Sequence, residues 1–326
     1  MVASPGVKLS GFVNRLRPGD VGCLHQGAYG ARGRYTTMST SGAPSRRITL
    51  RGYPGDPKPR ILGEFFLTAD NVTLSRLLFD GPTGRVERRT HDNPGGEAEQ
   101  LYLSGRNLEV TRSEVRNNRW HAGIYALNAT DARIVGNYIH HNGDFADPAR
   151  ANLDHGIYFA SGSGLIADNL ITRNYAFGVH LYPSPRNVVV RNNRIFRQGR
   201  AGVIIGSEPG EPLPAGNRIV GNVIASNGHR AITSYGELGP GNIVESNRVC
   251  ANGTAGATRG LTVRRARAAQ LPRARGCPTP VADHWDPGGG NRGRSGVAAD
   301  RATNLRPSPS RWPSLPSGSS ADRARR

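Results

Sequence analysis

A short segment of the chain, DHGIY at 154–158, gathers side chains that can carry protons or charge. Asp154, His155 and Tyr158 lie within these five residues, and His121 opens a similar segment upstream. Enzymes use His and Tyr side chains as proton donors and acceptors. Removing the proton beside a sugar carboxylate needs a base, an acid and a cation that neutralises the carboxylate. We therefore take Asp154, His155, Tyr158 and His121 as the candidate catalytic residues.

Other chemistry is open to the same segment. Hydrolysis of a glycosidic bond needs two carboxyl groups, one on each side of the bond. Asp154 could provide one of them, and Glu99, Asp144 or Asp147 the other. A structural alternative is that Asp154 caps the turn into its strand, and that the Tyr and His side chains are ordinary surface residues.

A second group of side chains has the chemistry of sugar binding. Aromatic rings stack on the faces of sugars, while Arg and carboxylate groups bond sugar hydroxyl and uronate groups. Arg200 is the candidate that neutralises a substrate carboxylate. The full set of candidate substrate-binding residues is Tyr102, Tyr125, His180, Arg200, Glu99 and His229.

A repeat sets the spacing of these side chains. Between residues 105 and 252 the chain repeats one phrase: apolar pair, Asn, apolar pair, Asn. Its first polar position recurs after 24, 32, 24, 29 and 25 residues, which indicates a solenoid. Alternating Val and Ile indicate short strands rather than helices. Because coils stack about 4.8 Å apart, equivalent Asn side chains should pair at tight bends. The first column is Ser113, Asn137, Asn169, Asn193, Asn222 and Asn247, and the second is Asn118, Asn142, Asn174, Gln198, Asn227 and Asn252.

The strand before each phrase determines which side chains face outward. Neighbouring side chains of a strand point to opposite faces, so one column should enter the core and the next should face solvent. Gly123, Gly156, Gly178 and Gly202 form a column without side chains, which either admits a ligand or only permits a bend. The inward column is Leu101, Ile124, Ile157, Val179, Val203 and Ile232. The outward column is Tyr102, Tyr125, Tyr158, His180, Ile204 and Thr233.

Three N-terminal segments add a resemblance to the repeat. They read LRPGDVGCLHQGAYG at 16–30, SRRITLRGYPGDPKPRILG at 45–63 and DNVTLSRLLFDG at 70–81. With the Asn phrases, they resemble the right-handed parallel β-helix repeat proteins of the pectate-lyase-like superfamily. The resemblance covers residues 12–253 and implies that fold. It leaves the activity open, because the superfamily holds lyases, hydrolases, epimerases and non-catalytic members.

The chain departs from the characterised members of this superfamily. It lacks an Asp cluster like the calcium-binding one of pectate lyases, and its repeats contain no lysine that could act in catalysis. We therefore assign no metal ligands. The alternative that Ca²⁺ binds through Asp144, Asp147 and Asp154 stays open.

The predicted organisation is an all-β, right-handed parallel β-helix of about ten coils at 12–253. It follows a short segment at 1–11 and precedes a disordered basic tail at 254–326. Insertions at 82–98 and 143–153 should wall a groove over the outward column. The tail is rich in Arg, Pro, Gly and Ser and holds 14 Arg and 4 Asp.

Composition limits the partners and the location. The net charge is +19, but Lys8 and Lys58 are the only lysines, so Arg dominates in a way more typical of GC-rich coding than of a nucleic-acid surface. No stretch is long and apolar enough for a membrane span, and we expect a monomer. The N-terminus lacks the pattern of a signal peptide. We nevertheless predict a secreted or cell-surface protein, because members of this superfamily are usually exported.

Two functions compete on this evidence. The first is a carbohydrate-active β-helix that acts on an acidic polysaccharide as a lyase, epimerase or glycoside hydrolase. The second is a non-catalytic, carbohydrate-binding or cell-surface solenoid. A third idea, a copper-site maturation factor, is disfavoured because the chain has two Met and three Cys and lacks Cys–His clusters.

Overall fold

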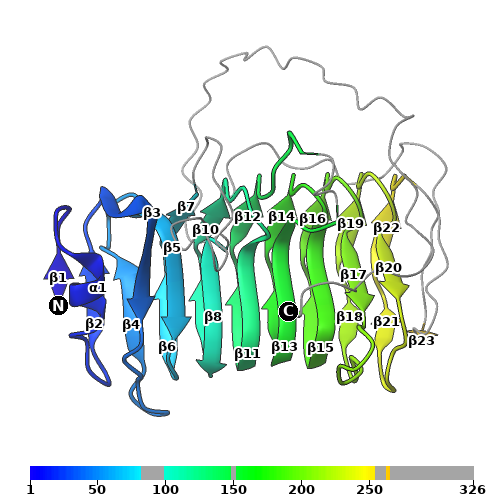
Figure 1. Ribbon diagram of the computed structural model, residues 1–326, viewed down its shortest axis with the longest axis horizontal. Helices are drawn as coiled ribbons and strands as arrows, with labels where there is room; N and C mark the ends of the chain where they lie inside the picture. Colours follow the sequence, from blue (N-terminus) through cyan, green and yellow to red (C-terminus); the bar gives the residue numbers. More distant parts are fainter. Residues whose placement is uncertain (82–98, 148–151, 254–261, 265–326) are drawn as a thin grey trace, which may run out of the picture. The chain divides into compact units, whose positions relative to one another are not determined.

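The computed structural model describes residues 1–81, 99–147, 152–253 and 262–264. There the chain winds into coils that stack in sequence order, and their strands pair in parallel (Figure 1). This confirms the predicted parallel β-helix. The strands form three faces, which we call the first, second and third in the order in which a coil passes through them.

The first face carries the candidate residues. Its strands are β3 (Ala28–Met38), β5 (Arg60–Thr68), β8 (Leu101–Arg106), β11 (Ala122–Val135), β13 (His155–Ala167), β15 (Phe177–Arg191), β17 (Val203–Gly206) and β20 (Ile232–Tyr235). The strands β11, β13 and β15 are long because each continues into the second face without a break.

The other two faces complete each coil. The second face adds β1 (Val2–Ala3), β2 (Val21–Leu24), β4 (Ile48–Gly52), β6 (Val72–Ser75), β9 (Glu109–Thr111), β18 (Arg218–Val220), β21 (Ile243–Glu245) and β23 (Thr262–Arg264). The third adds β7 (Leu78–Asp80), β10 (Glu114–Arg116), β12 (Tyr138–His140), β14 (Leu170–Thr172), β16 (Arg194–Phe196), β19 (Val223–Ala225) and β22 (Arg248–Cys250).

The core lies inside the coils. The predicted inward column is buried and belongs to one continuous apolar cluster, together with residues such as Phe65 and Val110. Since each coil buries its apolar side chains against the coils before and after it, stacking provides the core that a single coil lacks.

Both Asn columns run through the interior at the bends that flank the third face. Each amide bonds the next coil: Asn169 Oδ1 accepts the Asn137 backbone N–H at 2.8 Å, and Asn169 Nδ2 donates to Asn193 Oδ1 at 2.9 Å. At these bends the residue before each column member adopts left-handed backbone. These residues are Arg112, Gly136, Asp168, Asn192, Gly221 and Ser246 for the first column and Asn117, His141, Arg173, Arg197, Ser226 and Ala251 for the second.

The two ends of the stack differ from the prediction. A single helical turn, α1 (Leu9–Val13), buries Leu9, Phe12 and Val13, and β1 pairs with β2, so the first residues join the solenoid. One turn is too short to leave a helical period in the sequence. At the other end, β23 pairs with β21 inside the stretch predicted to be disordered. The rest of the predicted tail lies outside the described residues.

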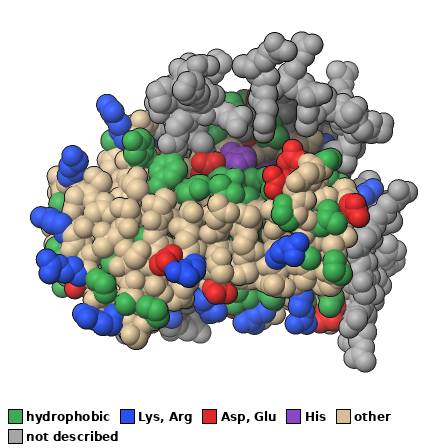
Figure 2. All heavy atoms as spheres, turned by 60° about the horizontal axis from the view of Figure 1, so that its bottom comes forward, with side chains coloured by type: hydrophobic (Ala, Val, Ile, Leu, Met, Phe, Trp, Pro, Cys, Tyr) green, Lys and Arg blue, Asp and Glu red, His purple; other side chains and the backbone are tan. Residues whose placement is uncertain are grey.

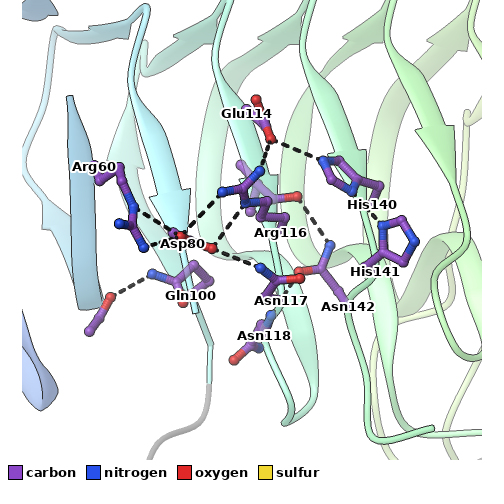
Figure 3. A network of polar contacts seen from close by, with 12 residues as sticks. Arg60, Asp80, Gln100, Glu114, Arg116, Asn117, Asn118, His140, His141 and Asn142 are labelled. Carbon is purple, nitrogen blue, oxygen red and sulfur yellow. Dashed lines mark hydrogen bonds and ion pairs between the residues drawn. The ribbon is translucent and has the colours of Figure 1, made fainter. Parts of the chain in front are cut away.

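A buried carboxylate organises the third face near its N-terminal end (Figure 3). Asp80 accepts hydrogen bonds from Arg60 Nη2 at 2.7 Å, Arg116 Nε at 3.0 Å and Asn117 Nδ2 at 2.8 Å. Arg116 also contacts Glu114, and Glu114 contacts His140. Burial pushes the pKa of Asp80 up, but the bonds from Arg116, Arg60 and Asn117 outweigh it and hold the pKa below its usual range.

The Asp80 network predicts an acid-sensitive contribution to stability. Asp80→Asn should lower the free energy of unfolding at neutral pH by about 2 kcal/mol, a value reduced because Arg60 is partly exposed. A carboxyl group with a depressed pKa stabilises the fold above its unfolded value, near 4, and this contribution fades as pH falls. Denaturant unfolding should therefore show the two proteins converging below about pH 4. The exposed pair Arg218–Glu245 gives the control, Glu245→Gln, with a change below about 0.5 kcal/mol.

Candidate functional site

Seven aromatic side chains form a row along the first face. Successive coils contribute one ring each, except that the coil of β17, before the last ring, contributes none. Neighbouring ring centroids are 5.0 to 6.3 Å apart. We call this set the aromatic row: Tyr35, Phe66, Tyr102, Tyr125, Tyr158, Tyr182 and Tyr235. Figure 2 shows a band of apolar side chains on one face, with acidic and His side chains beside it, whereas Lys and Arg lie mostly toward the margins.

The predicted outward column lies in register on this face and shares Tyr102, Tyr125 and Tyr158 with the row. Tyr102 pairs with Tyr125, Tyr125 with Tyr158, and Tyr158 with His180, and the column continues to Ile204 and Thr233. The alternation in the sequence therefore predicted correctly which side chains share this face. The predicted exposure was wrong for Tyr158, His180 and Ile204, which are buried although they point outward.

His121 occupies a tightly held turn just before β11. Its backbone is left-handed, with φ of 61°, which for a residue other than Gly costs roughly 1 kcal/mol or more. Asn118 of the second Asn column donates its amide to the carbonyl of Ala122 at 2.6 Å and to that of Trp120. Asp154 accepts the His121 backbone N–H at 2.9 Å. The neighbouring coil and the Asn column thus fix the position of this imidazole.

Glu99 orients the imidazole of His121. Glu99 Oε1 lies 3.0 Å from His121 Nδ1, and their side chains are 13% and 26% exposed. When a carboxylate accepts a hydrogen bond from Nδ1–H, Nε2 is left as a proton acceptor. The ring of His121 contacts two members of the aromatic row, with centroids 5.1 Å from Tyr125 and 4.8 Å from Tyr158.

The two tyrosines beside His121 are held in the protonated form. Burial, followed by the charge of Glu99, raises the pKa of Tyr125 to about 12. Burial also raises the pKa of Tyr158 far above its usual value, with Tyr125 as the next contributor. Both phenols therefore keep their protons at neutral pH and can act as proton donors. An oriented imidazole and two protonated phenols converge at one place on the row.

His155 and His180 form a second, deeper pair. His155 Nε2 lies 3.1 Å from His180 Nδ1, and His180 Nε2 lies 3.2 Å from the Tyr235 hydroxyl. Burial, then the charge of His121, lowers the pKa of His180 to about 3, so this imidazole is neutral. His155 also stacks on Phe177. These two candidates lie under the aromatic row, whereas the sequence analysis placed His180 on an accessible face.

Asp154 is fully buried, and both of its oxygens accept backbone N–H groups. Oδ1 accepts from His121 and Oδ2 from Asp144, each at 2.9 Å. The carboxylate thus ties the 143–147 segment to the turn that holds His121. This agrees with the structural alternative, in which Asp154 caps a turn, and leaves no exposed surface on Asp154 for a substrate.

Arg200 and His229 belong to a separate cluster. Arg200 lies three coils along the stack from His121, is buried, and donates to Asn152 Oδ1. Burial lowers the pKa of Arg200 and also that of His229, which is further lowered by the charge of Arg200. The structure therefore does not bring these two candidates to His121. Arg119, two residues before His121, is the cation that sequence reasoning missed, and it pairs with Asp144.

The glycine column serves packing rather than ligand approach. A Cβ on Gly123 would lie 2.7 Å from Asn142 Nδ2, and one on Gly156 would lie 2.7 Å from Asn174 Nδ2. The missing side chains make room for the second Asn column. This packing role differs from both alternatives considered from the sequence, ligand approach and a simple bend.

The insertions are described only in part. Residues 82–98 and 148–151 lie outside the described part of the chain, and so does the wall that they were expected to form. The described segment 143–147 packs on Tyr175, through a ring contact with Phe145 and a hydrogen bond from the Tyr175 hydroxyl to the Asp147 carbonyl.

Two of the three acidic residues considered for calcium contact protein groups instead. Asp144 pairs with Arg119, and the oxygens of Asp154 are bonded to backbone donors. Across residues 1–81, 99–147 and 152–253, no group of three or more His, Cys, Asp or Glu side chains is arranged to hold a metal ion. In the same ranges, no helix has the length and hydrophobicity required to cross a membrane.

Residues missed by sequence reasoning complete the row. Tyr35 and Phe66 extend it on one side, and Tyr182, Tyr235 and Glu208 close it on the other. A signal for Glu208 was available: the 29-residue step between Asn193 and Asn222 contains the insertion SEPGEPLPAG.

Comparison with known proteins agrees with this architecture. A family model described as a right-handed β-helix region matches residues 99–265, about half of the chain. The protein belongs to this family. No curated protein sequence matches this right-handed β-helix protein significantly.

Solved structures share the fold at low sequence identity. The right-handed β-helix protein is similar to pectate lyase Pel9A, with a TM-score of 0.58 and 14% identity over 81% of this chain and 75% of that one. An alginate lyase from Paenibacillus sp. str. FPU-7 gives 0.45 and 11%, over 76% and 95% of the two chains. The A-module of the Azotobacter vinelandii mannuronan C-5 epimerase AlgE4 gives 0.39 and 15%, over 75% and 72%. At these identities the likeness shows the fold alone.

Proposed function

We propose that this protein is a carbohydrate-active β-helix that acts on an acidic polysaccharide, with His121 as the base. The observation that carries the proposal is the contact between Glu99 and His121 beside the rings of Tyr125 and Tyr158. The fold shared with a pectate lyase supports the substrate class. Such a polymer lies outside cells, and we therefore propose a secreted or cell-surface location.

The reaction that fits this arrangement is β-elimination. His121 Nε2 would take the proton next to the uronate carboxylate. The electron pair of that C–H bond becomes a carbon–carbon double bond as the glycosidic C–O bond breaks, and the Tyr158 hydroxyl donates its proton to the leaving oxygen. Solvent then carries the proton from His121 back to the tyrosinate. Arg119 is the candidate cation for the uronate, and Asp154 holds the His121 turn.

Elimination is favoured over hydrolysis by the positions of the carboxylates. A hydrolytic pair needs carboxyl groups about 5 to 9.5 Å apart with access to the sugar. Asp154 is buried and bonded to backbone groups. Glu208 follows β17, four coils from the coil of Glu99, which separates their backbones by roughly 19 Å along the axis.

The aromatic row itself supports a second candidate, a non-catalytic glycan-binding solenoid. Rings stacked at the spacing of the coils offer a continuous surface for sugar faces and need no acid or base. Binding without turnover would distinguish this function from the first.

A substrate panel tests both candidates. The protein would be incubated with uronate-containing and neutral polysaccharides, with and without calcium. We expect reducing ends to appear together with the ultraviolet absorbance of an unsaturated uronate. Reducing ends without that absorbance would indicate hydrolysis. Retention on a glycan column without any product would favour the binding function.

Tyr158 should matter for turnover through its hydroxyl. Tyr158→Phe keeps the ring and its stacking but removes the proton donor, so we expect kcat to fall roughly 100-fold with a smaller change in KM. Tyr53→Phe, on a ring that stacks on His25 away from the row, is the matched control. An unchanged kcat in Tyr158→Phe would contradict the assignment of Tyr158 as the acid and would make Tyr125 the next candidate.

A further inference from the structure

The two ends of the aromatic row differ in a way that bears on how a polymer would bind. At the N-terminal end, Tyr35 is 63% exposed. At the C-terminal end, His180 and Ile204 of the outward column are only 5% and 7% exposed, whereas Tyr235, the last ring of the row, is 40% exposed. Side chains from three successive coils account for this difference.

Tyr235 reaches back along the stack. It pairs with Gly206 on the preceding coil, yet its hydroxyl lies 3.2 Å from His180 Nε2, on the coil before that. A Cβ on Gly206 would lie 2.2 Å from Tyr235 Cε1, so the ring lies across the bare backbone of Gly206. Tyr235 therefore covers the strip along which the row would otherwise continue.

Tyr182 and Glu208 fix this cover in place. The Tyr182 hydroxyl donates to Glu208 Oε2 at 2.8 Å, and the ring of Tyr182 contacts the ring of Tyr235, with centroids 5.5 Å apart. Glu208 comes from the insertion after β17, at the edge where β11, β13 and β15 continue uninterrupted into the second face. The row is thus open at Tyr35 and closed by three interlinked side chains.

From this we infer that the protein engages its polysaccharide at a chain end. The sugar chain lies along the row with its terminus against Tyr182, Tyr235 and Glu208, and the rest of the polymer leaves past Tyr35. Glu208 can accept hydrogen bonds from the hydroxyl groups that only a terminal sugar presents there. This inference rests on the proposed function for its substrate, and it adds the mode of attack.

Two variants open the closed end by different means. Tyr235→Ala removes the ring. Gly206→Ala keeps the Tyr235 ring but places a methyl group in the space that the ring occupies. The clash is with the Tyr235 side chain, which can rotate away. Tyr35→Ala, at the open end, should weaken binding of long chains without changing the mode. Thermal unfolding of all three would verify that they are folded.

The mode of attack is measured on the polymer that the panel identifies. The wild type should release one short product size from the start, while viscosity falls slowly. Both opening variants should give mixed product sizes and a viscosity loss severalfold greater per bond broken. Mixed sizes from the wild type, or a single product size from the opening variants, would overturn the inference while leaving the proposed function intact.

Binding provides an answer if no polymer is cleaved. The protein would be titrated with two size fractions of a bound polysaccharide at equal mass. Recognition of chain ends requires that the binding capacity scale with the number of chains, whereas internal recognition gives equal capacity per unit mass. Equal capacity would overturn the inference, and the absence of turnover would separately count against the proposed reaction.

Discussion

His121→Asn is expected to lower turnover by roughly 10²- to 10⁴-fold, the range associated with loss of a positioned general base. Asn is the suitable replacement because it tolerates the left-handed backbone of this turn and keeps the N–H that Asp154 accepts. The free energy of unfolding should change by less than about 1 kcal/mol. Steady-state kinetics on the identified polymer and denaturant unfolding would measure both quantities.

Glu99→Gln gives the matched comparison. It keeps a side chain of the same shape beside His121 Nδ1 but removes the charge that fixes the tautomer, so kcat should fall by less than in His121→Asn. The double variant should be no slower than His121→Asn alone, because the two groups act as one unit. Equal activity in the wild type and His121→Asn would show that the base lies elsewhere, with the pair His155 and His180 as the next candidates.

Asn169→Ala should have the largest effect on stability, about 3 to 5 kcal/mol, from several buried bonds lost at about 1 kcal/mol or more each. Its amide bonds both neighbouring coils, through Asn137 and Asn193, and also donates to the Ile134 carbonyl at 2.8 Å. Truncation leaves these partners buried without their bonds. Because whole domains are stable by only about 5 to 15 kcal/mol, denaturant unfolding should reveal the loss clearly.

Ser163→Ala is the control for that experiment. Its hydroxyl accepts the Asp131 N–H at 3.1 Å on the surface of the neighbouring coil, where water can replace the lost bond. We expect a change below about 1 kcal/mol. A similarly small change in Asn169→Ala would mean that apolar stacking alone holds the coils together.

The fold was predictable because stacking repeats one local pattern. In each coil an adjacent pair such as Ile124 and Tyr125 indicates which side chain enters the core and which one faces outward. The Asn phrases fix the register between coils. The left-handed residue comes just before each column member, since a side chain that bonds the next coil needs the bend at that point.

The site was less predictable because it depends on contacts that skip or cross coils. Asp154 is buried and accepts the backbone N–H of Asp144, in the segment 143–147. The sequence does not show how that segment folds back onto Asp154. Tyr235 contacts His180 by lying over Gly206, and the local spacing of residues in the sequence does not predict a contact across two coils. Arg200 lies three residues before β17, which carries Ile204 of the outward column, but its side chain belongs to a different cluster.

The register that joins successive coils also makes each coil a unit of inheritance. Asn169 and Asn193 are 24 residues apart, and the strands that follow them, β14 and β16, pair residue for residue. A chain passing directly from Asn169 to Arg194 would meet equivalent neighbours in equivalent positions. Duplication or loss of such a segment lengthens or shortens the molecule by one turn and changes the aromatic row by one ring. Gene-level changes of one coil would thus adjust, in single steps, the length of sugar chain that a descendant accommodates.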